Sequence, residues 1–309
     1  VKIEQHQTGD KFWDCSIDRF HERIRAFVKI EDGCDRFCSY CIIPKSRGRV
    51  RSKPLNTLKN EIEALANGGI REIVLVGINL SAYGKGEDFN IVDAVKICNE
   101  NKKIKRIRLG SLEPDHLTDE VIEGLASCEK LCPQFHISLQ SGCNKTLKSM
   151  NRHYTAEEYK ALCAKLRASF DDASLTTDVM VGFNDETEAD FNESLDFVKE
   201  IAFEKVHVFP YSERVGTAAS KRGDNVSKQE KERRAAVMIE ETEKIRHNYL
   251  KSLVNTSKKV LFENEIKPGI YQGYTKSYLP VRMKYDRNIV GEELEVKITN
   301  YCDEFCIAE

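Results

Sequence analysis

The chain has 309 residues, and its 48 Lys and Arg nearly balance its 50 Asp and Glu, which gives a net charge of −2. This balance excludes nucleic-acid binding driven by overall charge, so such binding would need a local basic patch. No apolar run reaches the roughly 18 residues of a membrane-spanning helix. Eleven cysteines in a chain of this size, with no apolar signal segment in view, predict reduced thiols and a cytoplasmic protein.

The first residues are polar and show no helix or strand pattern. We expect residues 1–20 to form a linker that follows an upstream domain outside this sequence. Phe12 and Trp13 are expected to pack on the surface of the next domain.

From residue 23 onward, short apolar runs alternate with helical patterns, which is typical of βα units and a parallel sheet. Strands are expected at residues 24–30, 72–78, 106–110, 134–139, 175–181 and 205–209. Helices are expected at residues 55–67, 91–99, 119–127, 156–170 and 188–201. Six strands with right-handed crossovers predict an α/β fold, a partial (β/α)6 barrel of the TIM type.

A long charged helix is expected over residues 227–254, and the spacing of Ser227 and Glu230 marks its start, as that of Thr155 and Glu158 marks an earlier one. Short alternating strands broken by Gly and Pro follow, near residues 260–262, 269–271, 279–283 and 294–298. They predict a small antiparallel β-barrel. We therefore expect one domain over residues 21–245 and a second over residues 246–309.

Cys34, Cys38 and Cys41 lie within one short loop after the first expected strand. Three thiolates leave one iron of a cubane iron–sulfur cluster open to a small molecule, whereas structural zinc sites prefer four ligands. The loop therefore favours a 4Fe–4S cluster. A zinc site and a chance group of small apolar side chains are the alternatives.

Barrel enzymes place their chemistry in the loops that follow the carboxyl ends of the strands. Polar or glycine residues occupy these positions after several expected strands, although any one of them alone is more often part of a turn. Close to the cysteine loop, Lys45, Arg47, Arg49, Arg51 and Lys53 alternate along the chain. On an extended segment they would share one face, which suits either phosphate contact or a solvated strand.

The C-x3-C-x2-C spacing with Tyr40 resembles the radical S-adenosylmethionine (SAM) superfamily. Residues 138–142, 150–154 and 177–183 resemble the methylthiotransferases. Within that family, residues 41–44, 77–84, 109–114 and 207–212 are most similar to the branch that acts on threonylcarbamoyladenosine in tRNA. The resemblance is dense over residues 20–254, and the C-terminal part resembles the RNA-binding TRAM domain.

This resemblance implies a cofactor and a reaction. Cys34, Cys38 and Cys41 would hold a 4Fe–4S cluster whose open iron is chelated by SAM, and one electron would split the sulfonium into a 5′-deoxyadenosyl radical. The residues implied for SAM are Tyr40, Gly77, Asn79, Ser111, Glu113, Gln140 and Asp178. Those implied for substrate or RNA are Arg47, Arg49, Arg51 and Arg152, with a possible stacking face of Lys258, Lys259, Tyr274, Lys276 and Tyr278 in the C-terminal barrel.

The implied activity is conversion of N6-threonylcarbamoyladenosine, next to the tRNA anticodon, into its 2-methylthio derivative. The expected partners are the tRNA anticodon region and a reductant for the cluster, and the protein is expected to be a monomer with no membrane contact. The family also uses a second 4Fe–4S cluster, which we expect in the upstream domain because only Cys15 precedes the loop. On its own, this chain is therefore expected to cleave SAM without completing methylthio transfer.

Two other functions remain open. One is a ribosomal-protein methylthiotransferase on the same scaffold, and the other is a non-catalytic RNA-binding protein with a structural metal. His136 is expected to be a satisfied rim histidine. The cysteines outside the loop, namely Cys98, Cys128, Cys132, Cys163, Cys302 and Cys306, are expected to be structural thiols.

Overall fold

The computed structural model describes residues 10–12, 24–302 and 304–309. Most of the expected linker, including Trp13 and Cys15, lies outside these residues. Phe12 is described, and the Lys29 and Lys53 ammonium groups lie 5.8 and 5.6 Å from its ring centroid. The expected contact between this part of the chain and the barrel surface is thus present at Phe12.

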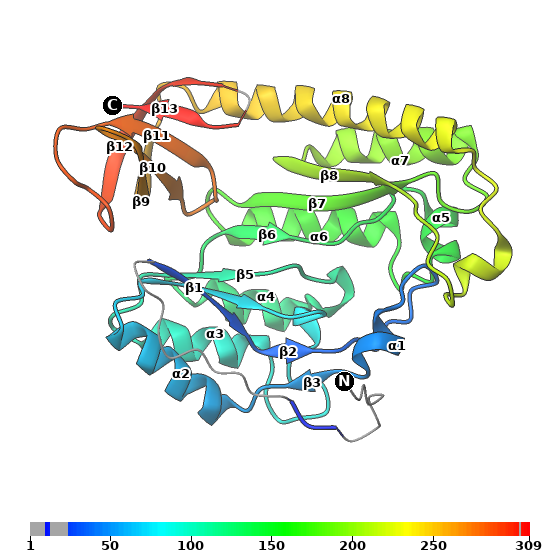
Figure 1. The fold of residues 1–309 in the computed structure, drawn as a ribbon, viewed down its shortest axis with the longest axis horizontal. Helices are drawn as coiled ribbons and strands as arrows, with labels where there is room; N and C mark the ends of the chain where they lie inside the picture. The colour runs from blue at the N-terminus through cyan, green and yellow to red at the C-terminus, as the bar shows by residue number, and fades with distance from the viewer. Residues whose placement is uncertain (1–9, 13–23, 303) are drawn as a thin grey trace.

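Six parallel strands form the frame of the larger domain, as expected (Figure 1). They are β1 (Arg25–Lys29), β4 (Glu72–Val76), β5 (Arg106–Leu109), β6 (Gln134–His136), β7 (Ser174–Val181) and β8 (Lys205–Pro210). Full ladders join them into two three-stranded sheets, β1-β4-β5 and β6-β7-β8. Parallel bridges from Ile107 to Leu131 and from Leu112 to Ile137 connect the two sheets. The predicted partial (β/α)6 barrel is confirmed.

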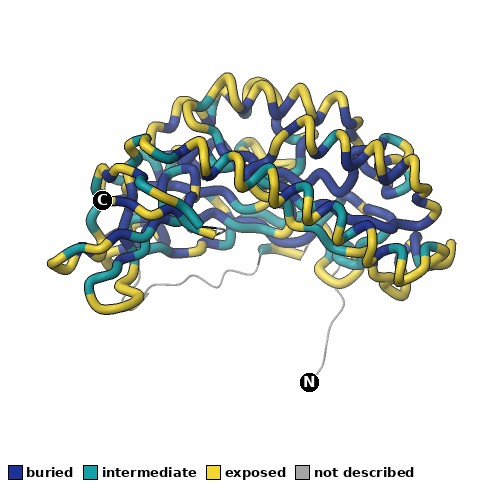
Figure 2. Tube along the Cα trace, turned by 90° about the horizontal axis from the view of Figure 1, so that it is seen from above, coloured by how far each residue is buried: buried dark blue, intermediate teal, exposed yellow. Residues whose placement is uncertain are grey.

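Helices cover the outer face of these strands (Figure 1). They are α2 (Leu55–Asn67), α3 (Ile91–Glu100), α4 (Asp119–Ala126), α6 (Ala156–Ser169) and α7 (Glu188–Ile201). The α6 start has the expected reciprocal cap, in which Thr155 Oγ1 accepts from the Glu158 amide and Glu158 accepts from the Thr155 amide. Figure 2 shows exposed residues along the outer turns of the helices and buried residues facing the strands. One apolar core lies between the two layers.

Short elements that the sequence patterns did not predict lie mostly near the carboxyl ends of the strands. They are β2 (Glu31–Asp32), β3 (Arg51–Ser52), α1 (Ile43–Arg47), α5 (Asn144–Ser149) and three 3-10 turns, η1 (Leu80–Ala82), η2 (Pro114–His116) and η3 (Ala219–Arg222). The β2–β3 ribbon is antiparallel and pairs Glu31 with Ser52 and Asp32 with Arg51. It closes the base of the cysteine loop.

The long helix α8 (Lys228–Ser252) begins at the expected cap, where Ser227 Oγ accepts from the Glu230 amide at 3.2 Å. It leads into a closed five-stranded barrel with the order β10-β11-β13-β12-β9. The strands are β9 (Ser257–Lys267), β10 (Ile270–Thr275), β11 (Pro280–Lys284), β12 (Glu293–Tyr301) and β13 (Cys306–Ala308). The expected boundary at residue 246 lies within α8, which ends six residues later.

The expectation of an antiparallel barrel is corrected at one pair. β13 is a short fifth strand that we did not predict, and it runs parallel to β11, with Val281 opposite Cys306 and Met283 opposite Ala308. The other pairs that the structure describes in this barrel are antiparallel. The barrel is therefore mixed.

The small barrel docks at the end of the larger domain where the parallel strands begin (Figure 1). Arg25 at the start of β1 forms an ion pair with Glu263 of β9 at 2.5 Å. Arg106 at the start of β5 forms an ion pair with Glu293 of β12 and donates to the Tyr274 carbonyl at 2.7 Å. The cysteine loop follows the carboxyl end of β1. The starts of the strands thus hold the second domain, and their carboxyl ends carry the cysteine loop.

This docking uses four of the five residues that we had expected to form an RNA-stacking face, and the fifth, Lys259, is exposed. Tyr274 and Tyr278 stack on each other with ring centroids 4.8 Å apart, and the Arg25 guanidinium lies over both rings. Lys258 forms an ion pair with Asp172 at 2.8 Å, and Lys276 donates to the Glu129 carbonyl. These side chains hold the two domains together.

The inner face of the strands is open at β1 and β8, whereas the residues of β4 and β5 are almost all buried. Alternate residues of β1, Ala26 and Val28, are buried, whereas Phe27 between them is 49% exposed. Lys205 and His207 of β8 alternate in the same way. A closed TIM barrel fills its interior with apolar side chains, so this inner surface is available to a ligand. None of the described helices is long and apolar enough to cross a membrane.

Candidate iron–sulfur and SAM site

The cysteine loop is fixed at both ends by backbone hydrogen bonds. The Cys34 amide donates to the Gly48 carbonyl at 3.0 Å, and the Cys41 amide donates to the Cys38 carbonyl at 3.0 Å. Between them, the Ser39 amide donates to the Met150 carbonyl at 2.9 Å. The connection between α5 and α6 therefore supports the centre of the loop.

The three thiols suit a cluster better than a single ion. All three cysteines are free; Cys38 is buried, and Cys34 and Cys41 are partly exposed. Among the described residues, no three His, Cys, Asp or Glu side chains form a group that could hold one metal ion. In a cubane cluster each thiolate binds a different iron, so the sulfurs need not converge on one point.

The surroundings of Cys34 and Cys41 favour the protonated thiol. Burial, together with the neighbouring thiols, raises the pKa of Cys34 to about 11, and burial also raises the pKa of Cys41. Because the thiolate is the form that binds metal, iron must displace protons from these groups. Three adjacent free thiols are the ligand set of a 4Fe–4S cluster with one open iron.

Arg152, which was expected to contact substrate, has a buried side chain that bonds to several protein groups. Its Nη1 donates to Cys38 Sγ at 3.3 Å, and its Nη2 donates to a Glu113 carboxylate oxygen. It also donates to the Ser138 carbonyl at 3.2 Å and from Nε to the Tyr154 hydroxyl at 2.9 Å. The guanidinium is saturated by the protein and points at a cluster ligand.

Glu113 is the centre of this charged group. Its carboxylate lies between Arg152 and Arg36, whose Nε is 3.3 Å away, and its amide donates to Ser81 Oγ at 2.7 Å. Arg36 is itself buried, and its Nη1 donates to both carboxylate oxygens of Asp115 at 2.6 and 2.8 Å. Glu113 is therefore held by two cations within the loop region, with about one sixth of its side chain exposed.

Asn79, after β4, has a buried side-chain oxygen without a hydrogen-bond partner. The backbone amide of Asn79 donates to Glu31 Oε2 at 2.7 Å, and the other oxygen of the Glu31 carboxylate is also buried and has no hydrogen-bond partner. Gly77 permits this arrangement, because a Cβ there would lie 2.6 Å from Glu31 Oε2. Burial raises the pKa of Glu31 to about 7. Unpartnered buried polar atoms are costly, and this pair is ready to receive a polar ligand.

Gln140 gives a similar signal on the opposite sheet. Its side-chain oxygen is buried without a partner, and its backbone has φ +70°. Its amide donates to the Asp178 carbonyl at 2.9 Å, and its carbonyl accepts from Met180. A bulky residue held at positive φ is a strained feature that often marks a functional site. Together, Asn79 and Gln140 fit a polar cofactor.

The remaining residues expected to bind SAM lie in different surroundings. Ser111 is exposed, and Tyr40 packs edge-on against Phe183 with centroids 6.2 Å apart. Asp178 faces the barrel interior, where its Oδ2 lies 3.2 Å from His136 Nε2. His136 Nδ1 contacts Thr176 Oγ1 at 3.0 Å, so the histidine is satisfied as expected.

The basic run is not one extended face, which corrects that expectation. Lys45 and Arg47 lie in α1, and Lys53 is buried against Glu61. Arg51 is also buried at its side chain and lies 3.4 Å from Asp32. Arg47 and Arg49 expose 45% and 61% of their side chains, and Lys45 is also exposed.

Each of the two exposed arginines forms an ion pair with an aspartate. Arg47 Nε lies 3.2 Å from Asp32, and Arg49 Nη1 lies 3.4 Å from Asp35. The Arg49 guanidinium also stacks 4.8 Å from the centroid of the Phe37 ring, within the cysteine loop. Both cations are thus held next to the loop with their remaining donors accessible.

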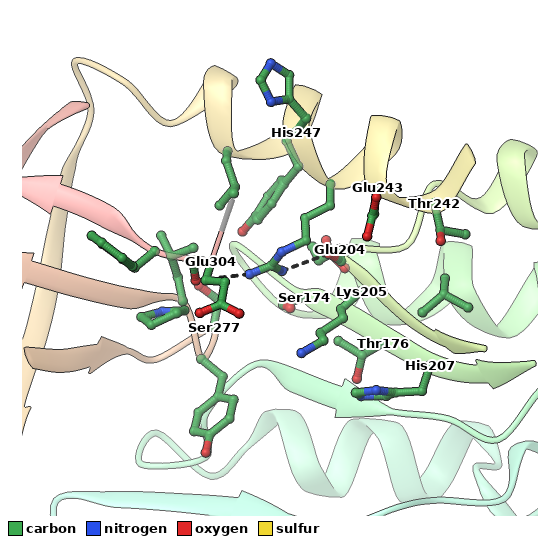
Figure 3. A pocket seen from close by; sticks show the side chains of 18 of the residues that line it. Ser174, Thr176, Glu204, Lys205, His207, Thr242, Glu243, His247, Ser277 and Glu304 are labelled. Atoms are coloured by element: carbon green, nitrogen blue, oxygen red, sulfur yellow. Dashed lines mark hydrogen bonds between the residues drawn. The ribbon is translucent and has the colours of Figure 1, made fainter. Parts of the chain in front are cut away.

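A cavity of about 1310 Å³ lies between β6–β8, α8 and the small barrel. Figure 3 shows Thr176, Lys205 and His207 of the strands on one side, and Ser277 and Glu304 of the small barrel on the other. Arg246 of α8 spans the wall, donating to the Glu204 and Glu304 carbonyls at 3.1 and 3.4 Å. The cavity lies towards the starts of the strands, away from the cysteine loop, and its mixed charge selects no single class of ligand.

Several residues of the site were missed from the sequence. Glu31 and Asp32 end a buried strand, and two acidic residues in such a place are an unusual pattern that could have drawn attention to them. Arg36 lies between Cys34 and Cys38, and a charged residue in such a loop is usually expected to be exposed. Ser81, which anchors Glu113, gives no sequence signal of its own.

Comparison with solved structures supports the fold. Coproporphyrinogen III oxidase from Escherichia coli, described as a radical SAM enzyme, superposes with a TM-score of 0.55 at 15% identity, covering 84% of this chain and 68% of that one. The radical SAM methyltransferase TsrM from Kitasatospora setae gives a TM-score of 0.51 at 16% identity over 60% of this chain and 36% of that one. At these identities the likeness is one of fold.

Sequence relatives are more similar. The threonylcarbamoyladenosine tRNA methylthiotransferase of Thermotoga maritima is 36% identical over 290 residues, which are 94% of this chain and 66% of the relative. The corresponding protein of Bacillus subtilis is 35% identical over 92% of this chain and 64% of its own length. The tRNA-2-methylthio-N(6)-dimethylallyladenosine synthase of Acetivibrio thermocellus is 34% identical over 96% and 64%. This chain thus spans about two thirds of the length of these relatives.

A family model described as the Radical SAM superfamily matches residues 28–198, from the end of β1 through the cysteine loop to α7. The match includes the cysteine loop, Glu113 and Arg152 beside it, and Asn79 and Gln140, whose side-chain oxygens have no hydrogen-bond partner. Since it covers more than half of the 309 residues, the chain belongs to the radical SAM superfamily.

Proposed function

We propose that this chain is the SAM-cleaving part of a tRNA methylthiotransferase. The observation that carries the proposal is the loop with Cys34, Cys38 and Cys41 at the carboxyl ends of the strands, beside the unpartnered amides of Asn79 and Gln140. When bound there, a 4Fe–4S cluster and SAM supply the radical chemistry. The protein positions the cofactor and limits water around Cys38.

The tRNA part of the proposal is supported by the relatives, which carry names of tRNA methylthiotransferases, and by the attached five-stranded barrel. Among the described residues, no three further cysteines lie within one short loop as Cys34, Cys38 and Cys41 do. We therefore propose that the second cluster of the resemblance is bound outside the described residues.

We further propose threonylcarbamoyladenosine as the substrate. A threonylcarbamoyl group carries a carboxylate, whereas a dimethylallyl group is apolar, and an arginine fork recognises a carboxylate through two hydrogen bonds. Arg47 and Arg49 expose such forks beside the cysteine loop. The relatives themselves do not separate the two substrates, since both names occur at similar identity.

The cofactor part is tested by anaerobic reconstitution with iron and sulfide, followed by assays of iron content and of 5′-deoxyadenosine formed from SAM. Cys34→Ala should lose the cluster and the product. Cys302→Ala is the matched control, because Cys302 is also a partly exposed free thiol and lies in the other domain. Equal iron content in both variants would contradict the proposal.

The substrate is tested by mass spectrometry of tRNA nucleosides from a strain that lacks the gene. Loss of the 2-methylthio form of threonylcarbamoyladenosine supports the proposal. Loss of the dimethylallyl derivative instead would assign the other tRNA substrate. Unchanged tRNA with an unmodified ribosomal protein would assign the ribosomal-protein branch.

A further inference from the structure

Arg152 occupies a position that the proposed function does not explain. Its side chain is 1% exposed, so it cannot reach a tRNA substrate, and yet it is the cation in direct contact with a cysteine of the loop. The donated hydrogen bond to Cys38 Sγ is 3.3 Å long. A guanidinium at this position places a positive charge and a hydrogen-bond donor next to the sulfur.

We propose that Arg152 is a positioning residue that raises the reduction potential of the cluster held by Cys38. This inference rests on the proposed function only in needing the cluster. Hydrogen bonds to ligand sulfurs and local charge set the potential of iron–sulfur clusters. Reduction adds one negative charge, so a fixed cation bonded to the thiolate stabilises the reduced form more than the oxidised form.

The surroundings of Arg152 keep this contact fixed. Glu113 and the Ser138 carbonyl hold Nη2, and the Tyr154 hydroxyl accepts from Nε. Tyr154 is fixed in turn by donating towards the Ser138 and Leu139 carbonyls at 2.8 and 2.7 Å. A guanidinium bonded on three sides has little freedom to leave the sulfur.

The counter-charge, Glu113, lies next to the Cys38 contact and is shared between two arginines. Arg152 Nη1, which contacts Cys38 Sγ, also donates to Glu113 Oε1 at 3.3 Å, Nη2 donates to Oε2, and Arg36 Nε lies 3.3 Å from Oε2. Arg152 and Arg36 thus both face the Glu113 carboxylate, and Arg36 also forms an ion pair with Asp115. Substituting Arg152 alone leaves Glu113 with one cation, and substituting both Arg152 and Glu113 removes one charge of each sign.

The test is a potentiometric titration of the reconstituted full chain, followed by electron paramagnetic resonance of the reduced cluster. Arg152→Gln should shift the oxidised-to-reduced ratio at a fixed potential at least tenfold towards the oxidised form, about 59 mV for one electron. Arg152→Gln with Glu113→Gln should keep part of this shift, because the charged donor to the sulfur is absent while the net charge is restored. Arg152→Lys should lie between wild type and Arg152→Gln.

Arg222→Gln is the matched control. It removes the same charge from an exposed arginine that bonds to Ser149 next to the loop and touches no thiol. Its potential should equal that of wild type. A double variant with the wild-type potential would overturn the inference, and so would loss of the cluster from both Arg152→Gln and Arg152→Lys, since Arg152 would then serve assembly. Failure of the wild-type chain to bind any cluster would instead overturn the proposed function.

Discussion

Arg108 of β5 donates from Nε to Glu72 Oε1 of β4 at 2.8 Å, and both side chains are almost completely buried. The other nitrogens of Arg108 donate to the Lys276 and Thr275 carbonyls of the small barrel, each at 2.8 Å. One arginine thus links two neighbouring strands of a sheet to the second domain. The domains are joined through charge satisfied inside the interface, not through an apolar patch.

Arg108→Met should lower the free energy of unfolding by about 3 kcal/mol, because it leaves Glu72 buried with Arg25 as its remaining cation and removes the Arg108 donors from the Lys276 and Thr275 carbonyls. The Thr275 carbonyl keeps the Tyr278 amide as a donor. Denaturant unfolding measures this change. Lys160→Met is the control: its partner Glu200 and Lys160 itself are both about half exposed, and its loss should cost at most about 0.5 kcal/mol. Similar losses in the two variants would show that the buried pair has no special weight.

Gly33 precedes the first cysteine with φ +87°, and a Cβ there would lie 2.0 Å from the Arg49 carbonyl oxygen. Gly33→Ala should therefore displace the cysteine loop from residues 48–49 and lower the iron content after reconstitution. Gly86→Ala is closely matched, since Gly86 has φ +85° but no atom within 4 Å of the added Cβ. That control should show only the backbone penalty of about 1 kcal/mol, with full iron content.

Asn79→Leu separates ligand binding from stability. The buried Asn79 oxygen has no partner in the protein, so its removal should leave the melting temperature unchanged or slightly higher. If that oxygen bonds to SAM, the affinity of the reconstituted protein for SAM should fall about tenfold, the equivalent of one hydrogen bond of roughly 1.4 kcal/mol. Equilibrium dialysis measures the affinity. Unchanged affinity together with raised stability would remove Asn79 from the site.

The frame of this protein could be predicted because its signals are local. The apolar run of β4 and the helix α2 follow directly from periodicity and from turn residues, and the latter matches its expected bounds. The cysteine loop was likewise visible, because three thiols within eight positions are a chemical pattern that needs no tertiary information. Short elements such as β2 and β13 were missed, since two or three residues carry too little periodicity.

The partners of charged residues could not be predicted, because they are set by contacts distant in the chain. Arg152 suggested a substrate fork from its type alone, but Cys38 and Glu113, 114 and 39 positions away, hold it inside. Tyr274 and Tyr278 suggested base stacking, and the fold places the Arg25 guanidinium over both rings across the domain interface while Tyr278 stays 40% exposed. A sequence shows which side chains can form a cation–aromatic contact or an ion pair, and only the fold decides whether the partner is a ligand or the protein.

Glu204, after α7, should make stability depend on pH in an unusual direction. It is buried, accepts a hydrogen bond from the Leu175 amide, and lies near Arg167 and Asp172; burial raises its pKa to about 7. The unfolded chain titrates near 4.5, so the folded state binds the proton more tightly, and stability falls as the pH rises from about 4.5 to about 7. The loss should be at most about 3 kcal/mol. Denaturant unfolding near pH 5 and near pH 8 measures it. Glu204→Gln should reduce this difference and leave the part that Glu31 contributes, whose pKa burial also raises to about 7, while Glu200→Gln at an exposed position should keep the difference in full. A wild-type protein with no such loss, or a Glu204→Gln variant with the full loss, would assign the pH dependence to other groups.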